Sequence, residues 1–318
     1  GTQKCRVGGF TVTPLEMSMR ASIARGVIHM TGPAVDQCAA PYISVLNPSH
    51  IALRVKRDHT TSHHITLCSG DDLSEMKKRG WMEATLLDDS QSLQNQPFVT
   101  LGVGMAQKDG AACYFVVLLW PAALELRSRW GLPHADLHIT LAFDPCDVHG
   151  VEKSARRRVE RWSWLTPPLD WTVAANVLRE ALHMTSKEEF PRRVDDLLAA
   201  ANCLMDFASR DGPSTDAHAT LLCSRAELYY KLKPPRYEMA REDARAAAEL
   251  SPANARARLL CSFSAYQLRL WEEAVRWGLE AQTIEDGVNL SKAENTKLSL
   301  MLQNVQGKLR EQTNKDRK

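Results

Sequence analysis

The same four residues, His-Ile-Thr-Leu, occur in the stretches "TSHHITLCSG" (61–70) and "ADLHITLAFD" (135–144). Both stretches carry β-branched residues and end at Gly or Asp, which is typical of short strands. Side chains alternate between the two faces of a strand, so the His and Thr of each copy point to one face and the Ile and Leu to the other. Each copy therefore predicts a buried strand that presents an imidazole and a hydroxyl to one face of a sheet.

Further segments of the same character surround the two copies. Short runs of β-branched and aromatic residues, bounded by Pro, Gly, Asp or Ser, predict strands. These runs are 42–46, 63–68, 98–105, 113–120 and 136–143. Sequences with helical character separate them, at 48–58, 72–81 and 121–132. The pattern predicts an α+β fold built on a sheet.

The second half of the chain has a different pattern. From 177 to 311 it is rich in Ala, Leu, Glu and Arg, with apolar residues at helical spacing. Between the halves, "WSWLTPPLDW" (162–171) has two prolines that cannot continue a helix and three tryptophans that predict a packed junction. We therefore predict an α+β domain over 1–165, with its core at about 40–150, and an all-α domain over 172–311.

The helical half also repeats itself. Aligning 224–252 on 262–286 places Ala240 against Ala274 and Ala247 against Ala281, each pair 34 residues apart. Small residues at these places let two antiparallel helices approach closely. The pattern resembles tetratricopeptide repeats, which implies stacked helix pairs that bind a protein or peptide partner. An earlier pair at about 174–184 and 190–208 and a capping helix at 289–311 complete the predicted array.

Composition sets broad limits on the function. The chain has 318 residues, of which 44% are hydrophobic and 25% charged, as in ordinary globular proteins. The formal net charge of +2 gives no general argument for binding to nucleic acid or membrane. Eight scattered cysteines form no CxxC pair, which favours reduced thiols over disulfides or a zinc site. With no secretory leader and no long apolar run, we expect a cytoplasmic or nuclear protein without a membrane partner.

If the two His-Ile-Thr-Leu strands are neighbours, their polar side chains converge on one groove. His64 and His138 would supply two proton carriers that titrate near neutral pH, and Thr66 and Thr140 two hydrogen-bond donors. One histidine would accept a proton from the nucleophile, the other would donate one to the leaving oxygen, and the threonines would hold the non-bridging phosphate oxygens. The scheme requires neither a metal nor another cofactor. A single copy would more often be a structural histidine, so the inference depends on the pair.

Paired His-x-Thr-x motifs in an α+β domain resemble the 2H phosphoesterase superfamily, over roughly residues 40 to 150. The resemblance implies a fold of two lobes, each contributing one motif strand to a central cleft, with His64, Thr66, His138 and Thr140 as the active-site residues. It also implies an activity on RNA ends or cyclic nucleotides, as in 2',3'-cyclic phosphodiesterases. In that family's usual assignment His138 would be the base that activates water and His64 the acid.

Other polar residues are less specific. Lys153 could contact a phosphate at the rim of the cleft, although a solvated lysine is the commoner arrangement. Tyr42 and Trp81 could stack on a base, with core packing as the alternative, especially for Tyr42. His63 should face the opposite side of its strand and serve a structural role. Basic runs at 54–57, 77–79 and 156–161 are usually solvated helix faces, but on one surface they could guide RNA.

A second interpretation is a non-catalytic adaptor that binds RNA or a nucleotide and recruits a protein partner through its repeats. The intact His and Thr of both copies favour the enzyme. The repeats also resemble those of heat-shock co-chaperones, which grip acidic peptide tails. Arg256 fits one clamp position, but Ser224 and Leu260 stand where that family places Asn and Arg, so we expect a different partner.

Overall fold

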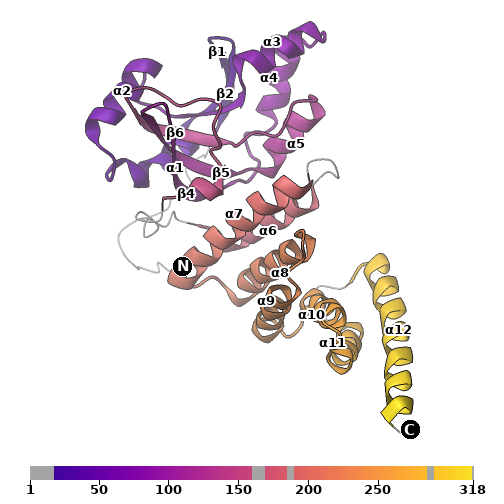
Figure 1. Cartoon of the computed structure of the whole chain (residues 1–318). Helices are drawn as coiled ribbons and strands as arrows, with labels where there is room; N and C mark the ends of the chain where they lie inside the picture. The colour runs from indigo at the N-terminus through magenta and orange to yellow at the C-terminus, as the bar shows by residue number, and fades with distance from the viewer. Residues whose placement is uncertain (1–17, 160–168, 185–189, 285–289, 317–318) are drawn as a thin grey trace, which may run out of the picture.

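The computed structural model describes residues 18–159, 169–184, 190–284 and 290–316. An N-terminal sheet domain is followed by a region built of helices (Figure 1). The predicted fold class, an α+β domain followed by an all-α region, is confirmed. Most of the junction predicted at 162–171 lies outside the described residues.

The sheet has six strands in the order β1-β2-β3-β6-β5-β4, and all neighbours are antiparallel. The strands are β1 (Arg20–Ala24), β2 (Val27–Thr31), β3 (His64–Cys68), β4 (Val99–Lys108), β5 (Ala111–Leu119) and β6 (His138–Asp144). The order divides the sheet into two three-stranded halves, which meet where β3 pairs with β6. The two motif strands are therefore the central strands of the sheet.

The hairpin β1–β2 was not predicted from the sequence. Its two-residue turn consists of Arg25 and Gly26, both with positive φ, of 53° and 72°. Turns of this kind match the right-handed twist of the strands that they join, and Gly26 adopts the conformation without strain. The strand before the turn is short and carries one large apolar residue, Ile23, so the hairpin is weakly marked in the sequence.

Within the part of the chain that the structure describes, five helices belong to the sheet domain. They are α1 (Pro33–Ile43), α2 (Pro48–Asp58), α3 (Gly70–Lys78), α4 (Glu83–Gln91) and α5 (Pro121–Arg129). The strand predicted at 42–46 is wrong, because this segment forms the end of α1 and the turn after it. Val35, Ala39 and Tyr42 recur at helical spacing and are fully buried, so the helical period of the whole segment outweighs the β-branched residues at its end.

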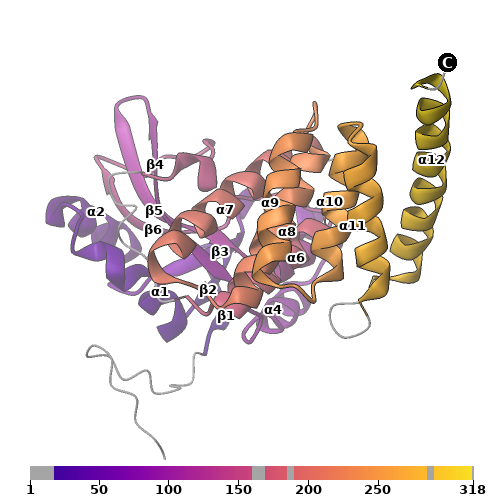
Figure 2. The same cartoon turned by 90° about the horizontal axis from the view of Figure 1, so that it is seen from below.

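Among the described residues, seven helices follow a 3-10 turn at Ala155–Arg157. They are α6 (Trp171–His183), α7 (Phe190–Asp211), α8 (Thr215–Lys231), α9 (Tyr237–Leu250), α10 (Ala255–Gln267), α11 (Trp271–Thr283) and α12 (Lys292–Asp316). They succeed one another away from the sheet, ending with α12 (Figures 1 and 2). The helix pairs and the final helix lie where the sequence placed them, and the tetratricopeptide-like nature of the repeats stays a prediction.

The two faces of the sheet are covered differently. One face packs on α1, α3, α4 and α5 in a core that includes Ile65, Leu67 and Ile139. On the other face, β4 and β5 share a second core with α6 and α7, which includes Phe115 and Phe207. This second core crosses the predicted boundary between the domains, whose independence stays a prediction. No helix among the described residues is long and apolar enough to cross a membrane.

Candidate active site

The two histidines of the repeated motif lie on neighbouring central strands. β3 and β6 are antiparallel, with Ile65 opposite Ile139. This register places Thr66 opposite His138 and His64 opposite Thr140, so all four polar side chains share one face. Ile65 and Ile139 point the other way and are fully buried, which fixes the orientation of both strands because a shift by one residue would expose them.

Two buried arginines hold the chain around these strands. Arg54 on α2 donates hydrogen bonds to the carbonyls of Thr60, Thr61 and Ser62, in the loop that leads into β3. Arg127 on α5 donates to the carbonyl of Leu67 at the end of β3 and to that of Pro133, before β6. Because buried carbonyls need donors, these two guanidinium groups stabilise both loops beside the motif strands.

The protonation of His138 follows from its neighbours. Its Nδ1 lies 2.6 Å from the carbonyl oxygen of Asp136. A carbonyl only accepts hydrogen bonds, so Nδ1 carries the proton and Nε2 keeps its lone pair. Nε2 in turn lies 3.3 Å from Nζ of Lys153, and the ring stands edge-on to Phe115 at 5.6 Å between centroids. His138 is thus held as a neutral imidazole with Nε2 available as an acceptor.

Lys153 is a buried member of the site. Its side chain is only 6% exposed, and its Nζ lies 3.4 Å from Oδ1 of Asp147 as well as near His138. Its backbone N–H donates to Asp136 at 2.9 Å. Asp147 also pairs with Arg57. Burial alone would raise the pKa of Asp147, but Lys153 and Arg57 hold that pKa well below its usual range. Lys153 is therefore buried and paired with Asp147, and it is not a solvated lysine.

A third histidine, His29 on β2, lies beside His64. The two rings are 4.4 Å apart between centroids, at an interplanar angle of 71°. His29 pairs with Thr66 across the strands and points to the same face as the motif residues. Sequence reasoning missed it because the β1–β2 hairpin was not predicted. The signal was present in the alternation of "VIHMT", where His29 stands between the fully buried Ile28 and Met30.

The two motif histidines are poor bases and poor proton carriers in the free protein. Burial, together with the neighbouring His29, lowers the pKa of His64 to about 4. Burial and the charge of Lys153 lower the pKa of His138, also to about 4. Both imidazoles are therefore neutral at pH 7, and a bound anion would raise their affinity for a proton.

A cavity of about 210 Å³ adjoins His138. It is lined by Asp136, His138, Val148, His149, Gly150, Val151 and Lys153. The volume exceeds that of a single water molecule, and polar side chains are among the residues that line it. The cavity leaves room for water beside His138.

The remaining candidates from the sequence are not part of this cluster. Tyr42 is fully buried in the core on the opposite face of the sheet, and Trp81 packs partly buried against the same core. Neither lies with the two motif histidines. His63 is buried, with Nδ1 2.9 Å from Asp36, in keeping with a structural role.

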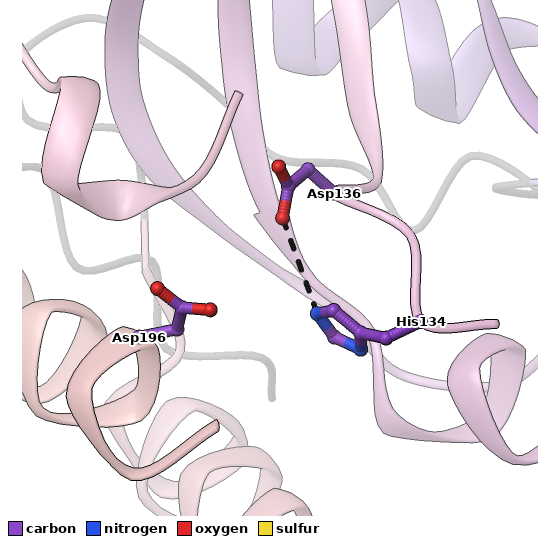
Figure 3. Close-up of side chains that lie close together, drawn as sticks. All are labelled: His134, Asp136 and Asp196. Atoms are coloured by element: carbon purple, nitrogen blue, oxygen red, sulfur yellow. Dashed lines mark ion pairs between the residues drawn. The ribbon is translucent and has the colours of Figure 1, made fainter. Parts of the chain in front are cut away.

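One group of residues within the described ranges resembles a metal site. His134, Asp136 and Asp196 place potential ligand atoms within 4.8 Å of one another (Figure 3). However, Nη2 of Arg193 lies 3.5 Å from Nδ1 of His134, and a guanidinium only donates. Nδ1 is therefore the acceptor and Nε2 carries the proton, 4.0 Å from Asp136. With a cation already beside it, the cluster fits an ion-pair network better than a metal centre.

Two adjacent antiparallel strands each present His and Thr to one face of the sheet. Residues 26–149 match the family model described as "Swiss Army Knife, 2H phosphoesterase domain". The match supports the 2H phosphoesterase superfamily for the sheet domain and a phosphoesterase-type activity in general. It includes both motif strands and His29 and ends before Lys153. No curated protein matches the sequence significantly.

Proposed function

We propose that the protein is a metal-independent phosphodiesterase that acts on RNA ends or cyclic nucleotides, with 2',3'-cyclic phosphates as the first substrates to test. The observation that carries the proposal is the placement of His64 and His138 on the two central strands, facing one side of the sheet. Two imidazoles beside one phosphate can supply both the general base and the general acid for cleavage of a diester.

The geometry favours His138 as the general base. Its Nε2 holds a lone pair next to Nζ of Lys153, and His138 lines the small cavity, where a water molecule can lie. In the proposed step, the water oxygen forms a bond to phosphorus and gives its proton to Nε2 of His138. The bond from phosphorus to the leaving ribose oxygen breaks, and that oxygen receives a proton from His64. The next water restores the starting protonation by exchange with the two imidazoles.

Binding of the anionic substrate prepares both histidines for this step. The phosphate charge raises the pKa of each imidazole, so that His64 can hold the proton that it donates. Lys153 is placed to contact a non-bridging oxygen next to His138, and the hydroxyls of Thr66 and Thr140 supply further donors. Asp147 and Arg57 keep the lysine in position.

The helical repeats would bind a protein partner. Arg256, which fits a clamp position of the co-chaperone type, forms ion pairs with Glu227 and Glu294. An arginine with two carboxylate partners is poorly suited to grip an acidic peptide tail, because those pairs would have to break. A partner of different chemistry is therefore expected.

The decisive experiment measures hydrolysis of 2',3'-cyclic nucleotides and of RNA with a cyclic phosphate end, with and without chelator. His64→Ala and His138→Ala should each lower kcat by about 100- to 10,000-fold. Turnover that survives either substitution would contradict the two-histidine mechanism, and turnover lost to chelator would contradict metal independence. Binding without turnover by the unmodified protein would support the adaptor.

A further inference from the structure

The face of the sheet that carries His64 continues as a polar surface over β1 and β2. Its side chains form two rows across the strands, in which Ser22 is opposite His29 and His29 opposite Thr66, while Arg20 is opposite Thr31 and Thr31 opposite His64. All six are at least partly exposed. The intervening residues of β2 and β3, such as Met30 and Ile65, are fully buried on the other face.

As far as the described residues show it, the second half of the sheet has no comparable surface. On β5 the residues of the same face are Phe115, Val117 and Leu119, which are buried under α6 and α7. A substrate whose phosphate lies between His64 and His138 can therefore extend over β1 to β3, but not over β4 and β5. The two sides of the scissile bond meet different surroundings: a small cavity beside His138, and an extended polar face beside His64.

His29 lies where this face begins. Its ring contacts that of His64, and its Nδ1 is buried without a hydrogen-bond partner among the described residues. Burial lowers the pKa of His29, although a hydrogen bond with the backbone of Ala24 raises it, so the imidazole is neutral at pH 7. At the nearby turn, Arg25 donates to the carbonyl of Arg57 at 3.1 Å and borders the surface. Neutral donors and acceptors with a cation at the edge suit a hydroxylated sugar next to a phosphate.

We propose that the face formed by Ser22, His29 and Thr31 is the leaving-group subsite, and that it binds the ribose whose oxygen departs with a proton from His64. This inference rests on the proposed phosphodiesterase activity. The departing oxygen must lie beside His64 to receive its proton, so the sugar attached to that oxygen comes to lie over β2. There His29 forms a hydrogen bond with a ribose hydroxyl, and Thr31 contacts the sugar from the adjacent row.

The test compares two diesters that differ in the leaving group. Uridine 2',3'-cyclic phosphate has a ribose as the leaving group, whereas bis(4-nitrophenyl) phosphate has a phenol without further hydroxyls. His29→Phe keeps a ring against His64 and removes the hydrogen bond. The ratio of kcat/KM for the cyclic nucleotide to kcat/KM for the aryl diester should fall about 10-fold, as the loss of one hydrogen bond to a substrate hydroxyl predicts.

Two further variants make the result specific. Thr31→Val should lower the same ratio about 3-fold. If His29→Phe does not fold, Thr31→Val alone tests the subsite. His183→Phe, an exposed histidine at the end of α6, is the matched control and should leave the ratio as it is. A ratio that is unchanged in both His29→Phe and Thr31→Val overturns the subsite, whether or not the individual rates fall.

A binding measurement separates this inference from the activity on which it rests. Uridine 3'-monophosphate and inorganic phosphate are titrated into the unmodified protein and into His29→Phe. The subsite predicts that the nucleotide binds about 10-fold more weakly to His29→Phe, with no change for phosphate. This result would uphold the subsite even if no diester were hydrolysed. Equal nucleotide affinity for both proteins would overturn it, even if hydrolysis were found.

Discussion

Lys153 contributes a positive charge to the candidate active site. It is a buried cation between His138 and Asp147, and Asp147 also pairs with Arg57. Buried charges are expensive unless they are paired, and Asp147 compensates the charge of this lysine. In the proposed reaction the lysine stabilises the negative charge that grows on the phosphate oxygens.

Replacing this lysine tests its role. Lys153→Met keeps most of the apolar stem but removes the charge, and we expect kcat for a cyclic nucleotide to fall about 100-fold or more, as for the loss of one stabilising donor. Lys108→Met, which changes an exposed lysine on β4, is the control and should have wild-type kinetics. A Lys153→Met protein that is folded and fully active would show that the lysine is only structural.

The lowered pKa values of His64 and His138 predict how stability depends on pH. In the unfolded chain both imidazoles take up a proton below about pH 6.5. In the folded protein they do so only near pH 4. The unfolded state therefore binds more protons between these values, and stability falls as the pH drops from 6.5 to 4.5, by about 1–2 kcal/mol per histidine.

Denaturant unfolding at a series of pH values measures this effect. The double variant His64→Asn/His138→Asn lacks both groups and should lose less stability over the same range. Part of the dependence should remain, since burial also lowers the pKa of His29 and His63. If the double variant and the parent show the same slope, the two motif histidines are not the groups that titrate.

At the scale of elements, the contact between β4 and β5 fixes the surroundings of His138. A Cβ added at Gly104 on β4 would lie 2.4 Å from a carbon of the Phe115 ring on β5. The same ring packs edge-on against His138 and lies 5.7 Å from Nζ of Lys153. Glycine at this place in a strand therefore allows Phe115 to pack beside both His138 and Lys153.

Gly104→Ala should displace the Phe115 ring and with it the support of His138. We expect a loss of about 1–3 kcal/mol in the free energy of unfolding, as for other overpacked cores, together with a lower kcat. The control is Gly307→Ala on α12, where a Cβ meets nothing within 4 Å, and which should be neutral or stabilising. Thermal unfolding and steady-state kinetics on both variants check the expectation, and an unchanged Gly104→Ala protein would contradict it.

The sequence predicted the structure best where the pattern that identifies an element lies within one short segment. The repeated motif identified the strands of His64 and His138, because alternation and repetition are local properties. Tyr42 shows the opposite case, since its β-branched neighbours suggested a strand while the helical spacing of Val35 and Ala39 decided the structure. His29 was missed with its hairpin, and the burial of Lys153 depends on Asp147 and Phe115, partners that only the folded chain brings together.

At the scale of the whole molecule, the helical region completes the sheet domain. Without α6 and α7, the buried residues of β4 and β5, Val117 and Leu119 among them, would face water. Phe207 on α7 is fully buried and lies next to β4, where a Cβ added at Gly102 would be 3.6 Å from its ring. The guanidinium of Arg158 lies over the same ring at 4.7 Å. The first helix pair thus serves as the second layer of the sheet, in addition to beginning the repeats.

Because α7 shares this core with β4 and β5, we expect a destabilising substitution in α7 to destabilise these strands as well. Phe207→Ala should cost about 3–5 kcal/mol, as for other buried aromatic truncations. Hydrogen exchange followed by mass spectrometry should then show faster exchange in β4 and β5 as well as in α7, because the strands lose part of the layer that covers them. Phe263→Ala on α10 is the matched control: its ring packs against the core between α10, α11 and α12, so faster exchange should be confined to those helices. If Phe207→Ala leaves exchange in β4 and β5 unchanged, the sheet and the helices are independent domains that merely touch, and the helical region would contribute recruitment alone.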